Sequence, residues 1–242
     1  MAAAKPELWN SLRQWWNRER ESKSRIGAAW KLASVFWEFL RESTHERKRR
    51  RYGDLEYDWK RRVNTTSGGV AARSRLLGLL HSEYQPIEPE LFREIMAQMQ
   101  IPFEQFTIVD IGSGKGRAVL LAAEYPFQRI IGIELLPELH AIARQNVAEV
   151  MARESIKPAI ELQWGDAAQF RFPPEPLVVF LFNPLPELGL WNVIRNLDAS
   201  LRENPRPAHV IYVNPVHEGI VSGVAGLRKF WGTHQYSLYR NF

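Results

Sequence analysis

The sequence predicts an α/β fold: a mostly parallel sheet with helices on both faces and an antiparallel last strand, preceded by a helical N-terminal arm. Two observations indicate it. From Phe106 onward, short apolar segments alternate with longer segments of helical periodicity, a pattern that produces right-handed crossovers between parallel strands. One of the short segments, LVVFLF at residues 177–182, is apolar throughout, as is typical of a central strand buried on both faces.

The expected elements follow one another in regular order. The strands are expected at residues 106–111, 129–134, 159–163, 177–182, 209–213 and, as the antiparallel last one, 236–240. The helices are expected at residues 86–100, 116–124, 137–151 and 188–201, where apolar side chains recur at helical spacing. Such a Rossmann-like sheet binds ligands beyond the carboxyl ends of its strands, so the residues at those ends matter most.

The N-terminal quarter of the chain differs in composition from the rest. Residues 1–62 carry 16 Lys and Arg against 9 Asp and Glu, whereas residues 63–242 carry 16 against 18. Six of the nine tryptophans lie in this basic part, and apolar residues recur there at helical spacing. The polar stretch NTTSGGV, residues 64–70, marks the expected boundary between a basic, Trp-rich helical arm of residues 1–62 and a domain of residues 63–242.

Two roles stay open for the arm. Its helices pack on the domain or on a second copy of the chain, giving a homo-oligomer, or they dock on an acidic partner, whether a nucleic acid, a membrane surface or an acidic protein face.

Composition also excludes several kinds of chemistry. The chain has no cysteine, which rules out disulfides, thiolate metal sites and cysteine nucleophiles. Its histidines show no ligand spacing, so we expect no metal site. The first residues lack the pattern of a signal peptide and no segment is long and apolar enough to span a bilayer, so we expect a cytoplasmic protein.

A glycine-rich loop follows the first expected strand, in the sequence Asp110-Ile111-Gly112-Ser113-Gly114-Lys115-Gly116. Alternate glycines let the backbone turn tightly and approach a ligand where any Cβ would collide. The helix that follows directs its free N–H groups towards an anionic group. The spacing GxGxG differs from the GxGxxG of dinucleotide-binding loops.

Acidic residues follow the next two strands. Glu134 ends the second strand, where its carboxylate can accept hydrogen bonds from ribose hydroxyls. Gly165-Asp166-Ala167 follows the third and can offer a carboxylate and backbone groups to an adenine edge. Each acid alone is more commonly a solvated strand-end residue or a helix cap, but together with Asp110 they predict a nucleoside site.

These segments resemble the successive motifs of class I S-adenosylmethionine-dependent methyltransferases: VDIGSGKGRAVLLAA, IIGIELLPEL, GDAAQF and LVVFLFNPLP. The resemblance runs from about Gln85 to the C-terminus. It implies S-adenosyl-L-methionine as cofactor, with Asp110 and the loop residues Gly112, Ser113, Gly114 and Gly116 on the methionine part, Glu134 on the ribose, and Asp166 with Ala167 on the adenine. Tyr84 either closes over the cofactor or packs as an ordinary tyrosine. The upstream Tyr84-Gln85-Pro86 is similar to the branch that contains the non-SET histone lysine methyltransferases and many uncharacterised bacterial enzymes, and the bacterial set fits better.

Two further segments are candidates for the acceptor side. Asn183-Pro184-Leu185-Pro186 keeps the first half of the [DNS]PP[YFW] motif of amino-directed methyltransferases, and it otherwise serves as a proline stop after the strand. Because Leu185 and Pro186 depart from the motif, a protein side chain or small molecule is favoured over nucleic acid as acceptor. His217 is the candidate base, or else a surface or capping residue.

Three functions therefore remain open: a methyltransferase with an unidentified acceptor, a non-catalytic scaffold that binds an acidic partner through the arm, and a nicotinamide-dependent oxidoreductase.

Overall fold

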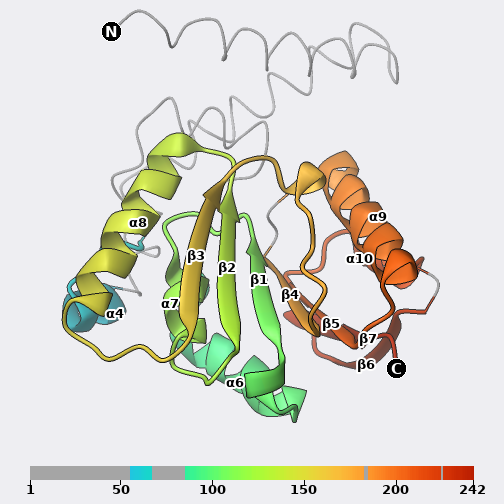
Figure 1. Ribbon diagram of the computed structural model, residues 1–242, viewed down its shortest axis with the longest axis horizontal. Helices are drawn as coiled ribbons and strands as arrows, with labels where there is room; N and C mark the ends of the chain where they lie inside the picture. The colour runs from blue at the N-terminus through green and yellow to red at the C-terminus, as the bar shows by residue number, and fades with distance from the viewer. Residues whose placement is uncertain (1–54, 67–84, 183–184, 225) are drawn as a thin grey trace, which may run out of the picture.

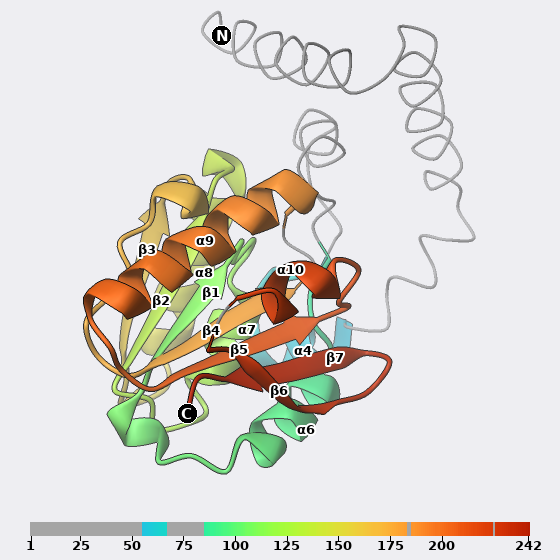
Figure 2. The ribbon, with the colours of Figure 1, turned by 90° about the vertical axis from the view of Figure 1, so that its right-hand side faces the viewer.

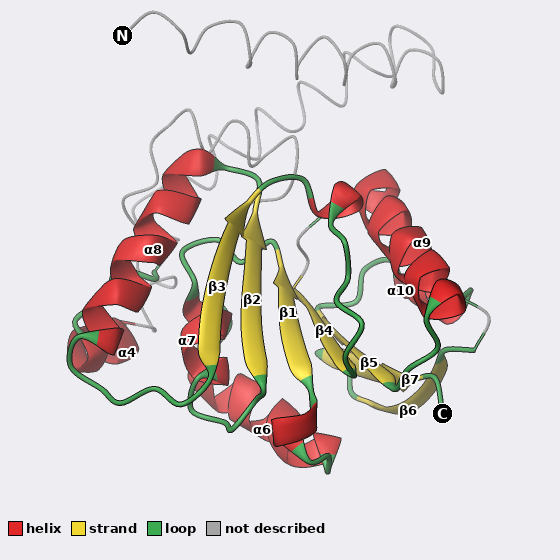
Figure 3. Cartoon of the chain, in the orientation of Figure 1, coloured by secondary structure: helices red, strands yellow, loops and turns green. Residues whose placement is uncertain are grey.

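The computed structural model describes residues 55–66, 85–182, 185–224 and 226–242 (Figure 1). Within these ranges the chain forms one seven-stranded mixed sheet with helices on both faces, in the strand order β3-β2-β1-β4-β5-β7-β6 (Figure 3). The predicted Rossmann-like fold class is confirmed.

Strands β1 to β5 pair parallel with one another, whereas β7 pairs antiparallel with both β5 and β6. The strands are β1 Thr107–Ile111, β2 Arg129–Glu134, β3 Ala159–Trp164, β4 Leu177–Phe182, β5 Ala208–Val213, β6 Arg228–Gly232 and β7 Tyr236–Arg240. The apolar β4 lies in the middle of the sheet, as its sequence predicted. The expected last strand, β7, pairs antiparallel with β5.

Two short elements near the C-terminus were not expected from the sequence. The edge strand β6 pairs only with β7 and is exposed at most positions on both faces, so its sequence RKFWG shows neither alternation nor an apolar run. Helix α10 (Glu218–Ser222) has 5 residues, too few to show helical periodicity.

Four helices match the expected ones to within a few residues: α6 Pro89–Met99, α7 Arg117–Ala122, α8 Pro137–Met151 and α9 Glu187–Glu203. The short helix α4 Leu55–Arg61 and the 3₁₀ turns η2 Phe103–Gln105 and η3 Ala167–Gln169 lie where no separate element was predicted. Both α6 and α8 begin with a proline, whose missing N–H is not needed in a first helical turn.

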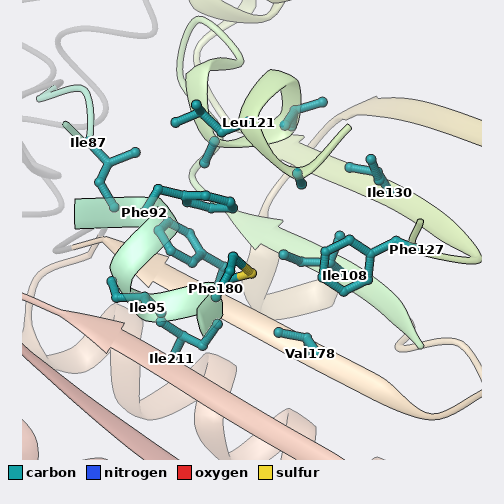
Figure 4. Close-up of a cluster of buried hydrophobic side chains, with 14 of the residues drawn as sticks. Ile87, Phe92, Ile95, Ile108, Leu121, Phe127, Ile130, Val178, Phe180 and Ile211 are labelled. Carbon is teal, nitrogen blue, oxygen red and sulfur yellow. The ribbon is translucent and has the colours of Figure 1, made fainter. Parts of the chain in front are cut away.

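A separate hydrophobic core covers each face of the sheet. On one face α6, α7 and α8 pack against the strands, and the rings of Phe92 and Phe180 lie 5.5 Å apart (Figure 4). The other face is covered by α9 (Figure 2). This helix buries Leu190, Val193 and Leu197 against the sheet. Successive β4 residues alternate between the two cores, which hold the central strands and their carboxyl ends in place.

The described residues nearest the N-terminus lie against the domain. Arg61, in the last turn of α4, pairs with Glu124 at 2.7 Å and with Glu154 at 3.1 Å. The two helical stripes expected nearer the N-terminus, within residues 8–16 and 26–40, lie outside the described residues. In the part of the chain that the structure describes, no helix is long and apolar enough to cross a membrane.

Candidate functional site

The carboxyl ends of β1, β2 and β3 lie at one edge of the sheet, where the arrowheads point towards the top of Figure 1. The glycine loop after β1 lies at this edge. Gly112, Gly114 and Gly116 all adopt positive φ, at 75°, 55° and 85°, a conformation that suits glycine and strains other residues. The backbone N–H groups of Gly112 and Ser113 both donate to the carbonyl of Ile133 at 2.9 Å. The loop is therefore folded over the end of the neighbouring strand.

Glu134, at the end of β2, is fastened to this loop. Its Oε2 accepts a hydrogen bond of 2.8 Å from the Gly114 N–H, and its Oε1 accepts one of 2.8 Å from the Leu136 N–H. Burial raises the pKa of Glu134, and the N–H groups of Leu136, Gly114 and Leu135 oppose that rise. Since each carboxylate oxygen has two lone pairs, the group keeps acceptor capacity for a ligand.

Asp110 is the second buried carboxyl at this edge. Within the described residues its Oδ2 has no hydrogen-bond partner, although the side chain is buried. Burial and the nearby charge of Glu134 raise the pKa of Asp110 to about 8. A buried carboxyl oxygen left without a donor suits a ligand with an N–H donor or a positive charge.

Ser113 and Gly116 shape the loop rather than lining it with side-chain atoms. A Cβ at Gly132 on β2 would lie 3.0 Å from the Ser113 Oγ, so this hydroxyl faces the sheet. A Cβ at Gly116 would lie 3.3 Å from the Cβ of Ala143, and its absence therefore eases the close packing of α8.

Asp166 and Ala167 follow β3 at the same edge. The Asp166 carboxylate caps η3 by accepting a hydrogen bond of 2.9 Å from the Ala168 N–H, while Ala167 is buried. Asp166 itself is exposed. The interpretation of Asp166 as a cap is confirmed. Its role in binding adenine stays a prediction.

Two exposed apolar side chains beside Glu134 were missed by the sequence analysis. Trp164 is 66% exposed at the end of β3, and its Nε1 donates to the carbonyl of Leu135, which is 40% exposed. Trp164 is the register partner of Glu134 across the β2–β3 pair. The sequence does place a tryptophan at the end of the third strand, beside the second strand, which ends in the candidate ribose-binding acid Glu134. That position could have indicated an exposed apolar side chain at the site.

The acceptor side is described only in part. Tyr84, Asn183 and Pro184 lie outside the described residues. His217 precedes α10, half-buried, and its backbone N–H donates to the Tyr212 hydroxyl at 3.2 Å. Its side chain makes no capping hydrogen bond to that helix.

Lys115 and Arg117, between and after the last two glycines, were not assigned a role from the sequence. Both side chains are buried and bond to residues 58–66. Burial lowers the pKa of Lys115 to about 8, and the Asp58 carboxylate opposes this shift. Among the described residues, no cluster of three or more acids and histidines is arranged to hold a metal ion.

No family model matches the sequence, and no curated protein matches it. Many solved structures share the fold. An RNA methyltransferase from Salinibacter ruber in complex with S-adenosyl-L-homocysteine is 22% identical, covers 64% of this chain and 91% of its own, and gives a TM-score of 0.45. A predicted N6-adenine-specific DNA methylase from Listeria monocytogenes is 16% identical over 65% of this chain and 51% of its own, with a TM-score of 0.50. A ribosomal protein L11 methylase from Lactobacillus delbrueckii is 17% identical over 63% of this chain and 74% of its own, with a TM-score of 0.44.

At these identities the likeness is one of fold. The chain shares the Rossmann-like fold of the Listeria monocytogenes methylase, which agrees with the fold that its motifs predicted. The likeness to the non-SET histone lysine methyltransferase branch stays a prediction.

Proposed function

We propose that this protein is an S-adenosylmethionine-dependent methyltransferase whose acceptor is a protein side-chain amine or a small molecule. One observation carries the proposal. The Glu134 carboxylate is held against the glycine loop by the Gly114 N–H, and the buried Asp110 carboxyl stands at the neighbouring strand end. The class I methyltransferase fold supports it, because in open α/β sheets ligands bind at this edge.

In this proposal different residues of the chain bind different parts of the cofactor. Glu134 accepts hydrogen bonds from the ribose hydroxyls, and Asp110 accepts from the amino group of the methionine part. Gly112 and Gly114 leave room for that part, Ser113 and Gly116 keep the loop in shape, and Asp166 with the Ala167 backbone takes the adenine. When bound, S-adenosylmethionine supplies an electrophilic methyl group on a sulfonium.

The acceptor side of the proposal rests on Asn183, Pro184 and His217. Methyl transfer requires alignment of the nucleophile, and removal of a proton when that nucleophile is protonated. We assign the alignment to Asn183-Pro184 after β4 and the proton to the His217 imidazole. Tyr84 covers the cofactor, and the basic arm docks an acidic partner or a second copy of the chain.

A labelling experiment tests the reaction. Purified protein is incubated with radiolabelled S-adenosylmethionine and host lysate, and the products are treated with protease or nuclease. We expect label in protein that protease releases, or in a small molecule, and less label with a Glu134→Ala variant at a cofactor concentration that does not saturate the wild type. Label released only by nuclease would contradict the acceptor class. Cofactor binding without any labelled product would favour the non-catalytic scaffold.

A further inference from the structure

A buried polar network joins residues 58–66 to the glycine loop. Asp58 lies at its centre. Its Oδ2 accepts hydrogen bonds from the backbone N–H groups of Thr65 at 2.6 Å and Thr66 at 2.9 Å. Its Oδ1 accepts from the Thr65 hydroxyl and from Nη2 of Arg117 at 3.0 Å. One carboxylate therefore organises the turn after α4 and pairs with the first residue of α7.

Arg117 is held from several directions. Its side chain is 1% exposed, its Nε donates to the Thr65 Oγ1 at 2.6 Å, and its guanidinium lies 5.0 Å over the ring of Tyr57. Arg117 directly follows Gly116, so its position fixes where the glycine loop ends. A buried ion pair adds little net stability, but removing one partner leaves an uncompensated charge. Such a pair specifies an arrangement more than it strengthens the fold.

Lys115 extends the same network to the middle of the loop. Its Nζ donates to Oδ1 of Asn64 at 3.0 Å and to the carbonyl of Thr66 at 2.7 Å. Asn146 of α8 completes the connection, since its Nδ2 donates to the carbonyls of both Asn64 and Lys115, at 3.0 Å and 2.9 Å. The residues on both sides of Gly116 are thus tied to residues 58–66.

These contacts have a consequence for the site. A loop with three glycines has much conformational freedom, and fixing it costs free energy whenever a ligand needs one shape. A loop that is already fixed binds the ligand without that cost. We propose that Asp58 is a positioning residue for the cofactor: through Arg117 and Lys115 it holds the glycine loop in the shape that presents the Gly114 N–H to Glu134. This inference rests on the proposed function.

A purely structural role for Asp58 would be to fasten α4 to the domain. The same helix is also held by Arg61, whose ion pairs with Glu124 and Glu154 reach the turns after α7 and α8 without touching the glycine loop. Arg61→Ala is therefore a matched control. It loosens α4 and leaves the contacts of Asp58 in place.

The test compares full-length Asp58→Asn, Arg61→Ala and wild-type protein. Calorimetric titration with S-adenosylhomocysteine gives affinity, thermal unfolding gives stability, and hydrogen exchange of residues 110–117 reports the loop. We expect Asp58→Asn to weaken binding by at least about fivefold, the lower end of typical coupling between sites, and to speed exchange in the loop. Arg61→Ala should lower the melting temperature while binding stays within about twofold of wild type.

A second variant covers the case in which Asp58→Asn does not fold. Asn64 is exposed, so Asn64→Ala removes one acceptor of Lys115 without emptying a core, and it should weaken binding in the same direction. Wild-type affinity in Asp58→Asn or in Asn64→Ala would overturn the inference, as would equal weakening by Arg61→Ala. A wild-type protein that does not bind S-adenosylhomocysteine would instead overturn the proposed function, and this inference with it.

Discussion

Gly114 donates its backbone N–H to the Glu134 carboxylate at 2.8 Å, which closes the gap between the ends of β1 and β2. Gly114 belongs to the loop after β1, and Glu134 is the last residue of the neighbouring parallel strand β2. Because the carboxylate is already oriented by Gly114 and Leu136, a ligand diol that takes its remaining lone pairs has little ordering to impose.

Loss of this carboxylate should therefore weaken cofactor binding. Glu134→Ala is expected to cost about 1–3 kcal/mol of binding free energy, because ligand hydroxyls and the Gly114 N–H lose their charged acceptor. Calorimetry with S-adenosylhomocysteine measures it. Glu138→Ala, an exposed acid in the first turn of α8, is the control and should bind as wild type. Equal affinity in the two variants would place the ribose elsewhere.

Binding should also depend on pH through Asp110. Its pKa of about 8 in the folded protein lies above the ordinary 3.8, so the folded state favours the protonated carboxyl. The contribution of Asp110 to the free energy of unfolding is therefore fully present below pH 3.8 and is lost as pH rises through about 8. A ligand with a cationic amino group favours the ionised carboxylate. Affinity should accordingly rise with pH towards about 8, by at most about tenfold per unit.

Titrations between about pH 6 and pH 8 check this expectation. The Asp110→Asn variant removes the ionisation while keeping the shape of the side chain, and its affinity should change much less with pH. A wild-type affinity that is constant over this range, or the same slope in the variant, would show that Asp110 does not meet the cation.

Gly114 tests the shape of the loop. Gly114→Val should nearly abolish cofactor binding, because a branched side chain fills the space next to the loop and strains a backbone with φ of 55°. Circular dichroism should show a retained fold. Gly219→Ala in α10, where a Cβ meets nothing within 4 Å, is the control. Wild-type binding by Gly114→Val would put the cofactor outside this loop.

The N-terminal arm should be separable from the cofactor site. Deletion of residues 1–50 removes none of the contacts of Glu134, Asp110 and Asp58 described above. The affinity for S-adenosylhomocysteine should therefore stay close to that of the full chain. Solubility, oligomeric state or acceptor recognition should change instead. If the arm docks an acidic partner, that binding weakens steeply with salt. A folded truncated protein without cofactor affinity would mean that the arm forms part of the site.

The sequence predicted the fold well wherever one residue pattern dominated. The uniformly apolar β4 and the periodic α8 were predicted with the bounds that the structure has, since burial on both faces or on one face leaves an unambiguous pattern. The edge strand β6 was missed because exposed residues carry no such constraint. The glycine loop and Glu134 were predicted to be neighbours because the carboxyl ends of parallel strands meet, and this is confirmed.

The network around Asp58 could not be predicted in the same way. Asp58 and Arg117 are separated by 59 residues, and neither belongs to a local sequence pattern that predicts their ion pair. Their contact depends on where the turn after α4 lies against α7, which is a tertiary relationship. The residues 55–62, expected in the arm, are in contact with the domain for the same reason.

In the proposed function, Asp110, Gly114 and Glu134 at the carboxyl ends of the strands bind S-adenosylmethionine. The most direct measurement is calorimetric titration of the full-length protein with S-adenosylhomocysteine and, separately, with NAD. We expect saturable binding of S-adenosylhomocysteine that Glu134→Ala weakens, and no binding of NAD. Binding of NAD with no response to S-adenosylhomocysteine would contradict the proposed function and favour a nicotinamide-dependent oxidoreductase.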